Sequence, residues 1–367
     1  MAIFVTRPYI PSKRKLNEYF DDILSRRQLT NNGPLVRELT TRLESFIGVN
    51  NLLLVGSGTL ALQVAIRLAK LKGNVLTTPF SFPATTSALV WTGCSPLFQD
   101  IDPDTYNIDV QKISESKLKD QNVSGILATH VFGAPCEVEE LDRISKSMRI
   151  PLLYDSSHCF GVRFEGKSVL SYGDISVLSF HATKIFQTVE GGALIFKTRE
   201  DYEIASEMIN FGYDQKGVLS SVGINAKMNE FEAAMGLALL DEIEIIMAGY
   251  QTASEKYNEL LSQALGRQKI APGCDYNYSY FPVLFPSEDT LIRASNSLNK
   301  IDVYPRRYFS PSLDTVGAYR SKQRCEVSRD IASRILCLPL YAEIELKDVE
   351  RISKAINVSL SSRPKRE

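Results

Sequence analysis

The sequence predicts an α/β protein with a large, mostly parallel sheet domain covered by helices and a smaller α+β domain at the C-terminal end. Apolar runs such as Leu52–Val55 and Leu152–Asp155 lack the alternation of a half-exposed strand, as expected for strands buried on both faces. Segments with helical periodicity separate these runs, which is the order of βαβ units. Residues 270–310 instead alternate aromatic residues with turns, which indicates a second, smaller unit.

The length of 367 residues is ample for a large buried core and favours two domains. We expect a large domain over residues 1–245 and a small domain over 246–367. The boundary then falls inside a long helical region at 229–257 that contains a kink or break.

Helices and strands alternate along the chain from residue 11 onward. The expected helices are 11–28, 35–47, 60–71, 83–91, 137–148, 229–257, 286–299 and 346–358. The expected strands are 52–55, 75–78, 95–100, 125–130, 152–155, 175–178 and 193–196. In sheets of this class ligands bind at the carboxyl ends of the strands, so residues at those ends are the first candidates for a site.

Composition excludes several classes of function. The chain has 42 basic and 43 acidic residues, which gives no support for a surface that binds nucleic acid. No apolar segment is long enough to span a bilayer and no signal peptide is evident, so we expect no membrane partner and a cytoplasmic location. The six cysteines are scattered without a C-x-x-C pair, so neither a disulfide framework nor a metal site is expected. The basic run at 363–366 is expected to be a frayed end.

One lysine, Lys184, lies in a turn between the apolar run 175–178 and a second run that follows Gly192. A lysine held between two buried strands loses hydration, which suggests a residue that forms a Schiff base with an aldehyde cofactor. A surface lysine in an ordinary loop is the alternative, and the motif alone favours that alternative.

Other residues at strand ends each allow a functional and a structural interpretation. The turn that contains Gly58 and Thr59 suits a single phosphate at a helix N-terminus, or is a tight turn with an N-cap. Asp155 could pair with a protonated ring nitrogen of a cofactor, or form a structural ion pair. Phe82 could stack on a flat ring, or could equally be a core aromatic residue. His158 could reach a ring substituent, although a lone histidine is more often structural. Together with Lys184, in the chain order 58–82–155–184, they describe a pyridoxal phosphate site.

The sequence resembles the nucleotide-sugar aminotransferases of the DegT/StrS type, which depend on pyridoxal 5'-phosphate and have fold type I, the aspartate aminotransferase-like fold. The resemblance covers nearly the whole chain. It rests on Leu29-Thr30-Asn31-Asn32-Gly33-Pro34, Gly56-Ser57-Gly58-Thr59-Leu60-Ala61-Leu62, Thr78-Pro79-Phe80-Ser81-Phe82, Asp155-Ser156-Ser157-His158, Ser179-Phe180-His181-Ala182-Thr183-Lys184, Glu190-Gly191-Gly192-Ala193, Gly223-Ile224-Asn225-Ala226-Lys227-Met228-Asn229-Glu230 and Leu338-Pro339-Leu340-Tyr341.

The resemblance implies roles for individual residues. Lys184 and Asp155 would be the catalytic residues. The cofactor would be held by Gly58, Thr59, Phe82, Asp155, His158, Ser179, Lys184 and Asn225. Asn225 would reach the cofactor phosphate of a neighbouring subunit, which implies a homodimer with shared active sites. Thr30, Asn31 and Tyr308 would contact the sugar nucleotide.

Within the family, the loop 29–34 and the lysine motif look most like dTDP-4-amino-4,6-dideoxyglucose transaminases. This likeness implies amination of a nucleotide-linked 4-keto-6-deoxy sugar with L-glutamate as donor, in the synthesis of glycans such as the O-antigen of lipopolysaccharide. Two segments depart from the family pattern: Phe132-Gly133 stands where Tyr-Gly is frequent, and Ser312-Leu313-Asp314 replaces a frequent histidine.

Other functions remain open. A 3-keto-sugar aminotransferase or a GDP-4-keto-sugar (perosamine-type) aminotransferase would carry the same motifs. Lys184 argues against a sugar dehydratase of the same fold, which usually has histidine at that position. A non-catalytic sensor with this fold is a distant alternative. The lack of a G-x-G-x-x-G motif argues only weakly against a nicotinamide-dependent oxidoreductase.

Overall fold

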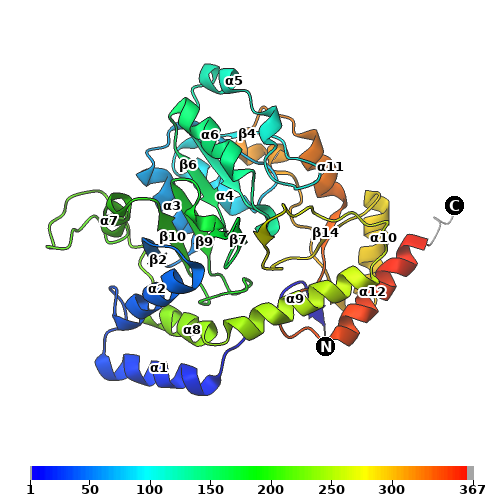
Figure 1. Ribbon diagram of the computed structural model, residues 1–367, viewed down its shortest axis with the longest axis horizontal. Helices are drawn as coiled ribbons and strands as arrows, with labels where there is room; N and C mark the ends of the chain where they lie inside the picture. The colour runs from blue at the N-terminus through cyan, green and yellow to red at the C-terminus, as the bar shows by residue number, and fades with distance from the viewer. Residues whose placement is uncertain (1, 362–367) are drawn as a thin grey trace.

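The structure, a computed structural model, describes residues 2–361, and the basic run at 363–366 lies outside these residues. Its main sheet has seven strands among the described residues, in the order β2-β10-β9-β6-β5-β3-β4 (Figure 1). The strand β10 runs antiparallel to both of its neighbours, and the remaining pairs are parallel. The predicted large, mostly parallel sheet covered by helices is therefore confirmed.

The elements follow the predicted alternation closely. The helices are α1 (Lys13–Arg26), α2 (Pro34–Ile47), α3 (Gly58–Leu68), α4 (Pro83–Trp91), α5 (Glu115–Asp120), α6 (Val138–Met148), α7 (Arg199–Met208), α8 (Glu230–Leu240), α9 (Ile243–Leu260), α10 (Glu288–Asn299), α11 (Glu326–Arg334) and α12 (Leu346–Ser361). The strands of the main sheet are β2 (Leu52–Val55), β3 (Gly73–Thr77), β4 (Cys94–Phe98), β5 (Gly125–Thr129), β6 (Leu152–Asp155), β9 (Ile175–Ser179) and β10 (Gly192–Phe196).

The main sheet is the middle of three layers, because successive side chains of a strand point to opposite faces. In β2, Leu53 and Val55 pack with α3, α4 and α7 on one face. Leu52 and Leu54 pack with α2 and α8 on the other face, where α6 covers the strands β5 and β6. Both faces of these strands are buried, which explains why the sequence has continuous apolar runs.

The C-terminal part of the chain joins the large sheet through α9, which follows α8 after a break at residues 241–242 (Figure 1). The helices α10 and α12 pack on each other, α12 packs on α9, and β12 (Pro282–Leu284) pairs with β14 (Ile335–Cys337). At the other end of the chain, β1 (Ile3–Phe4) pairs with β13 (Val303–Tyr304). The division into domains at residue 245 stays a prediction.

Several features were not anticipated from the sequence, among them the short helix α5 and the strand pairs β1–β13 and β12–β14. A small sheet of β7 (Arg163–Phe164), β8 (Lys167–Ser168) and β11 (Cys274–Asp275) joins two distant segments. The helices α7 and α11 bury few apolar residues, namely Ala205 in α7 and Ile331 and Ala332 in α11. Tertiary contacts stabilise such helices more than their own sequence does.

All six cysteines lie within the described residues and are free thiols. Over residues 2–361 there is no cluster of His, Cys, Asp or Glu suited to a metal ion. Within the same residues, no helix has the length and apolar character needed to cross a membrane.

Candidate active site

The carboxyl ends of β2, β3, β6 and β9 meet at one edge of the main sheet, because these strands point in the same direction. A cavity of about 280 Å³ opens at this edge. Eight of the residues predicted for the site line it: Gly58, Thr59, Phe82, Asp155, His158, Ser179, Lys184 and Tyr308. The topology therefore gathers residues that lie up to 250 positions apart in the sequence.

Lys184 is half-buried in this cavity, on the loop between β9 and β10. Its Nζ lies 3.2 Å from the hydroxyl oxygen of Tyr280 and 5.7 Å from the centre of that ring. Burial lowers the pKa of Lys184 to about 8, although Asp155 and Tyr308 act in the opposite direction. A substantial fraction of the amine is then neutral near pH 8 and able to act as a nucleophile or a base.

Asp155 ends β6 and is 4% exposed. Its Oδ2 accepts a 2.6 Å hydrogen bond from Thr85 Oγ1, and its Oδ1 accepts bonds of 3.1 and 2.6 Å from the N–H and the hydroxyl of Ser157. All of these partners are donors, which is the arrangement that stabilises an ionised carboxylate. The carboxylate also lines the cavity, so it can accept a further N–H from a bound ring.

His158 is held in one tautomer by the backbone. The N–H of Phe132 donates a 3.1 Å hydrogen bond to His158 Nδ1, so the proton of the neutral ring is on Nε2. Burial is the main cause that keeps the pKa of His158 well below its usual value, and the neighbouring Lys184 and His130 act in the same direction. The ring is thus a neutral donor through Nε2. Phe132, a departure from the family pattern, supports this histidine.

The turn between β2 and α3 forms a close cradle with the end of β9. Gly58 and Thr59 are the first residues of α3, whose N–H groups have no partner within the helix. A Cβ at Gly58 would lie 2.9 Å from Ser179 Cβ, so only glycine fits there without movement. Exposed backbone N–H groups, a helix N-terminus and the Ser179 hydroxyl suit a phosphate group.

Phe82 precedes α4 and is 49% exposed, although it is a large aromatic residue. It lines the same cavity as Lys184 and Asp155. An apolar ring face exposed inside a cavity suits a flat partner, which would cover it on binding.

The opposite wall of the cavity comes from the C-terminal part of the chain and consists of Tyr280, Arg306, Tyr308 and Phe309. The rings of Tyr280 and Tyr308 meet edge to face with centres 5.8 Å apart. The Arg306 guanidinium lies 5.0 Å from the centre of the Tyr308 ring. This wall is polar and aromatic, which suits a sugar or nucleotide more than an apolar ligand.

Three predicted residues do not line this cavity. Thr30 and Asn31 are exposed in the loop 29–34, and Asn31 lines a separate groove beside α7. Asn225 is exposed and pairs with Asn210 through an isolated backbone bridge. Their predicted contacts with cofactor and substrate remain predictions.

Four residues of the site were missed by sequence reasoning. Ser157 lies two residues from Asp155, and a hydroxyl that close in sequence to a buried acid is a usable signal. Thr85 lies three residues from Phe82 but 70 positions from Asp155, so its contact with the acid has no local signal. Tyr280 and Arg306 have no such local signal, because only the tertiary fold brings them to Lys184.

The fold and the lysine cavity define an enzyme of fold type I, the aspartate aminotransferase-like class. The sequence profile of the DegT/DnrJ/EryC1/StrS aminotransferase family matches residues 12–357. The chain is 38% identical over 361 residues to a dTDP-4-amino-4,6-dideoxy-D-glucose transaminase of Shigella dysenteriae, which covers 96% of this chain and 98% of that protein. It is 34% identical over 368 residues to the transaminase of the same name from Escherichia coli, with 97% and 98% covered.

A solved structure agrees with the sequence relatives. The crystal structure of DesI in the presence of its TDP-sugar product matches with a TM-score of 0.90 and 30% identity, over 97% of this chain and 92% of DesI. The chain therefore belongs to the DegT/DnrJ/EryC1/StrS aminotransferase family.

Proposed function

We propose that this protein is a pyridoxal 5'-phosphate-dependent aminotransferase that converts dTDP-4-dehydro-6-deoxy-D-glucose to the 4-amino-4,6-dideoxy sugar with L-glutamate as amino donor. The observation that carries the proposal is the convergence of Lys184, Asp155 and the cradle at Gly58 in one cavity. The names of the Shigella dysenteriae and Escherichia coli transaminases supply the sugar nucleotide.

The residues present fit this cofactor. The cradle of Gly58, Thr59 and Ser179 would take its phosphate, since a Cβ at Gly58 would fill the space. Phe82 would cover a face of its ring, and Asp155 would accept the N–H of its ring nitrogen. His158 would donate from Nε2 to the ring oxygen. When bound, pyridoxal phosphate supplies an electron sink for the bond broken at the donor's α-carbon.

The chain's own residues move the protons. The neutral amine of Lys184, favoured by its pKa of about 8, takes the α-proton of the amino donor and later delivers a proton to the sugar carbon. Tyr280, 3.2 Å from Lys184 Nζ, orients the amine when it is free. The Asp155 carboxylate, fixed by Thr85 and Ser157, holds its negative charge at the ring nitrogen.

A homodimer with shared active sites belongs to the same proposal. Asn225 is exposed and lies outside the cavity of its own chain, so a contact with a cofactor phosphate requires a second subunit. The segment 211–224 carries further exposed apolar residues, which such an interface would cover: Phe211, Val218, Leu219, Val222 and Ile224.

The experiment is a product analysis with three substrates. The purified protein is incubated with L-glutamate and with dTDP-4-keto-6-deoxyglucose, the corresponding GDP-4-keto sugar or a 3-keto sugar nucleotide, and products are identified by mass spectrometry and NMR. We expect nitrogen at C4 of the dTDP sugar. Amination of only the GDP or the 3-keto substrate would replace the proposed substrate, and the absence of an amino group on the sugar of every product would reject the aminotransferase proposal.

A further inference from the structure

Arg306 is the feature of the cavity wall that the proposed function leaves without a role. Its backbone is fixed by two hydrogen bonds to Cys337, of 3.1 and 2.8 Å, so the side chain starts from a rigid position. The side chain lines the same cavity as Lys184, and its guanidinium lies over the ring of Tyr308. Within the described part of the chain, no carboxylate lies within ion-pair distance of this guanidinium.

Among the charged side chains that line the cavity, Arg306 is the cation without an assigned partner. Its cationic side chains other than histidine are Lys184 and Arg306, and its carboxylates are Asp155 and Glu190. Lys184 and Asp155 are committed to the cofactor in the proposed function. Glu190 is exposed and lies 3.7 Å from His181. Arg306 is therefore the cation that remains for a substrate.

The neighbouring Arg307 has the opposite character. It forms an ion pair of 2.8 Å with Glu288 and donates a 2.5 Å hydrogen bond to the Ser333 carbonyl oxygen. It is not among the residues that line the cavity. Two adjacent arginines thus differ in role: Arg307 is used within the fold, and the Arg306 guanidinium has no hydrogen-bond partner among residues 2–361.

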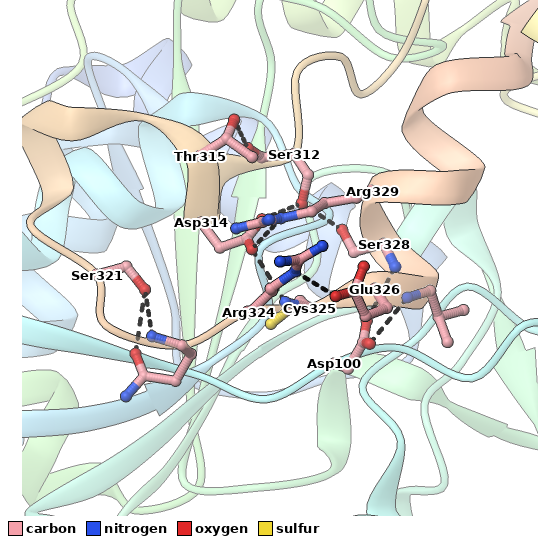
Figure 2. Close-up of polar contacts among 12 residues, drawn as sticks. Asp100, Ser312, Asp314, Thr315, Ser321, Arg324, Cys325, Glu326, Ser328 and Arg329 are labelled. Carbon is pink, nitrogen blue, oxygen red and sulfur yellow. Dashed lines mark hydrogen bonds and ion pairs between the residues drawn. The ribbon is translucent and has the colours of Figure 1, made fainter.

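The segment that follows Tyr308 is held by a polar cluster, which Figure 2 shows. The buried Asp314 accepts hydrogen bonds from Ser312 Oγ, Cys325 N and Arg329 Nε at 2.6, 3.0 and 2.8 Å. Asp100, which follows β4, accepts bonds of 2.9 Å from the N–H groups of Val327 and Ser328 at the start of α11. The wall is thereby fixed to the large sheet.

We propose that Arg306 is the anion-binding residue of this cavity and contacts an anionic oxygen group of the substrates that alternate there. The inference rests on the proposed function, in which L-glutamate brings carboxylates and the sugar nucleotide brings a diphosphate into one cavity. Carboxylate and phosphate oxygens are both matched by the planar fork of a guanidinium. Its free donors and rigid backbone prepare Arg306 for this contact before a substrate arrives.

The test measures each half-reaction in the holoenzyme and in three variants, R306Q, R306K and R307Q. The absorbance of the bound cofactor is followed in single turnovers, with increasing L-glutamate for the first half and increasing keto-sugar nucleotide for the second. For R306Q we expect the apparent Kd of at least one substrate to rise about ten- to a hundredfold, as for loss of a charged hydrogen bond. R306K should recover part of this loss, and R307Q should leave both Kd values within about twofold.

The two half-reactions show which substrate carries the anionic group that Arg306 binds. A rise confined to L-glutamate identifies a carboxylate, and a rise confined to the sugar nucleotide identifies the diphosphate. Both Kd values within about twofold of wild type in R306Q, with unchanged cofactor content and Tm, would overturn the inference. Calorimetric titration of the same proteins with 2-oxoglutarate and with dTDP measures anion binding even if wild type shows no transamination, so failure of the proposed function is seen separately.

Discussion

Thr85 Oγ1 donates a 2.6 Å hydrogen bond to Asp155 Oδ2, which joins the first turn of α4 to the carboxyl end of β6. Two more hydroxyls continue this contact. Ser81 Oγ lies 2.7 Å from Thr85 Oγ1, and Thr129 Oγ1 donates to Ser81 Oγ at 3.2 Å. Because the Thr85 proton is directed at the carboxylate, Thr85 accepts from Ser81. The buried hydroxyls thus support a negative charge on Asp155 before any cofactor binds.

The variant T85V is expected to weaken cofactor binding. It removes a donor to a buried carboxylate, which costs about 1.5–3 kcal/mol, or about ten- to a hundredfold in the Kd of pyridoxal phosphate. Absorbance titration of the apoprotein measures this Kd. T86V is the matched control, because Thr86 Oγ1 is buried and has no partner among the described residues. Equal Kd values for T85V and T86V would contradict the role of Thr85.

The capture of pyridoxal phosphate by the apoprotein is expected to depend on pH through Lys184. Burial lowers the pKa of this lysine to about 8, so the neutral, nucleophilic amine is the minor form below pH 8 and the major form above it. The rate of capture should rise about tenfold per pH unit up to pH 8 and then level off. Stopped-flow absorbance gives this rate.

A control reaction is needed because pyridoxal phosphate itself titrates, which also changes the capture rate with pH. The same measurement with N-acetyl-lysine amide, an exposed amine with a pKa near 10.4, should continue to rise above pH 8. Parallel profiles for the protein and the free amine would show that burial does not lower the pKa of Lys184. The K184A variant should lose the fast capture entirely.

Gly33 is expected to be essential to the loop 29–34 for a steric reason. A Cβ at Gly33 would lie 2.5 Å from Glu230 Cδ, and the Glu230 carboxylate accepts bonds from the N–H groups of Leu35 and Val36 at the start of α2. G33A should therefore lower the free energy of unfolding by about 1–3 kcal/mol, measured by denaturant titration. G317A is the control, since a Cβ there meets nothing within 4 Å and should be neutral. Equal stability of both variants would reject this explanation.

The polar cluster behind the cavity wall leads to a prediction about Asp314. The D314N variant removes the charge that Arg329 meets in a site where the Asp314 side chain is 0% exposed. We expect a loss of about 2–3 kcal/mol in the free energy of unfolding, together with a raised KM for the sugar nucleotide because the wall loosens.

An exposed pair on the same segment provides the control for Asp314. Glu326 pairs with Arg324, and both side chains are largely exposed, so E326Q should cost less than about 1 kcal/mol and leave KM unchanged. An unchanged stability of D314N would contradict the structural role of the cluster. A loss of stability with unchanged KM would mean that the cluster does not position the wall.

The part of the site that sequence could predict is the part built from local motifs. Asp155 follows an apolar run directly, and Gly58 and Lys184 come three and six positions after the end of one, so the chemistry of a strand end is readable from neighbouring residues. Tyr280 and Arg306 face Lys184 only after the C-terminal part of the chain folds back onto the large sheet. No hydrophobic period or residue spacing in the sequence predicts that these two residues will lie near Lys184.

The same distinction applies to the fold. The strands of the main sheet were predictable because both of their faces are buried. The helix α11 was not, because it buries only Ser328, Ile331 and Ala332 and begins at N–H groups capped by Asp100, more than 200 residues earlier. A helix whose cap comes from a distant strand has no local start signal.

Asn225 gives the sharpest test of a shared active site. Variants K184A and N225D are each expected to have little activity, because one lacks the amine and the other would place a negative charge at the cofactor phosphate in the proposed dimer. In a hybrid dimer of the two, one site combines Lys184 from one subunit with Asn225 from the other, so that site is intact. Random mixing after unfolding should therefore restore about a quarter of wild-type activity, since half of the dimers are hybrids with one intact site each.

The activity recovered in the mixture depends on which subunit supplies Asn225 to each site, and not on whether Asn225 is needed for activity. If Asn225 served the site of its own chain, every site in the mixture would lack one of the two residues and mixing would restore nothing. The matched control pairs K184A with D155N, whose altered residues line the same cavity of one chain. That mixture should stay inactive even when hybrids form, and activity in it would mean that subunit exchange is not what restores the site.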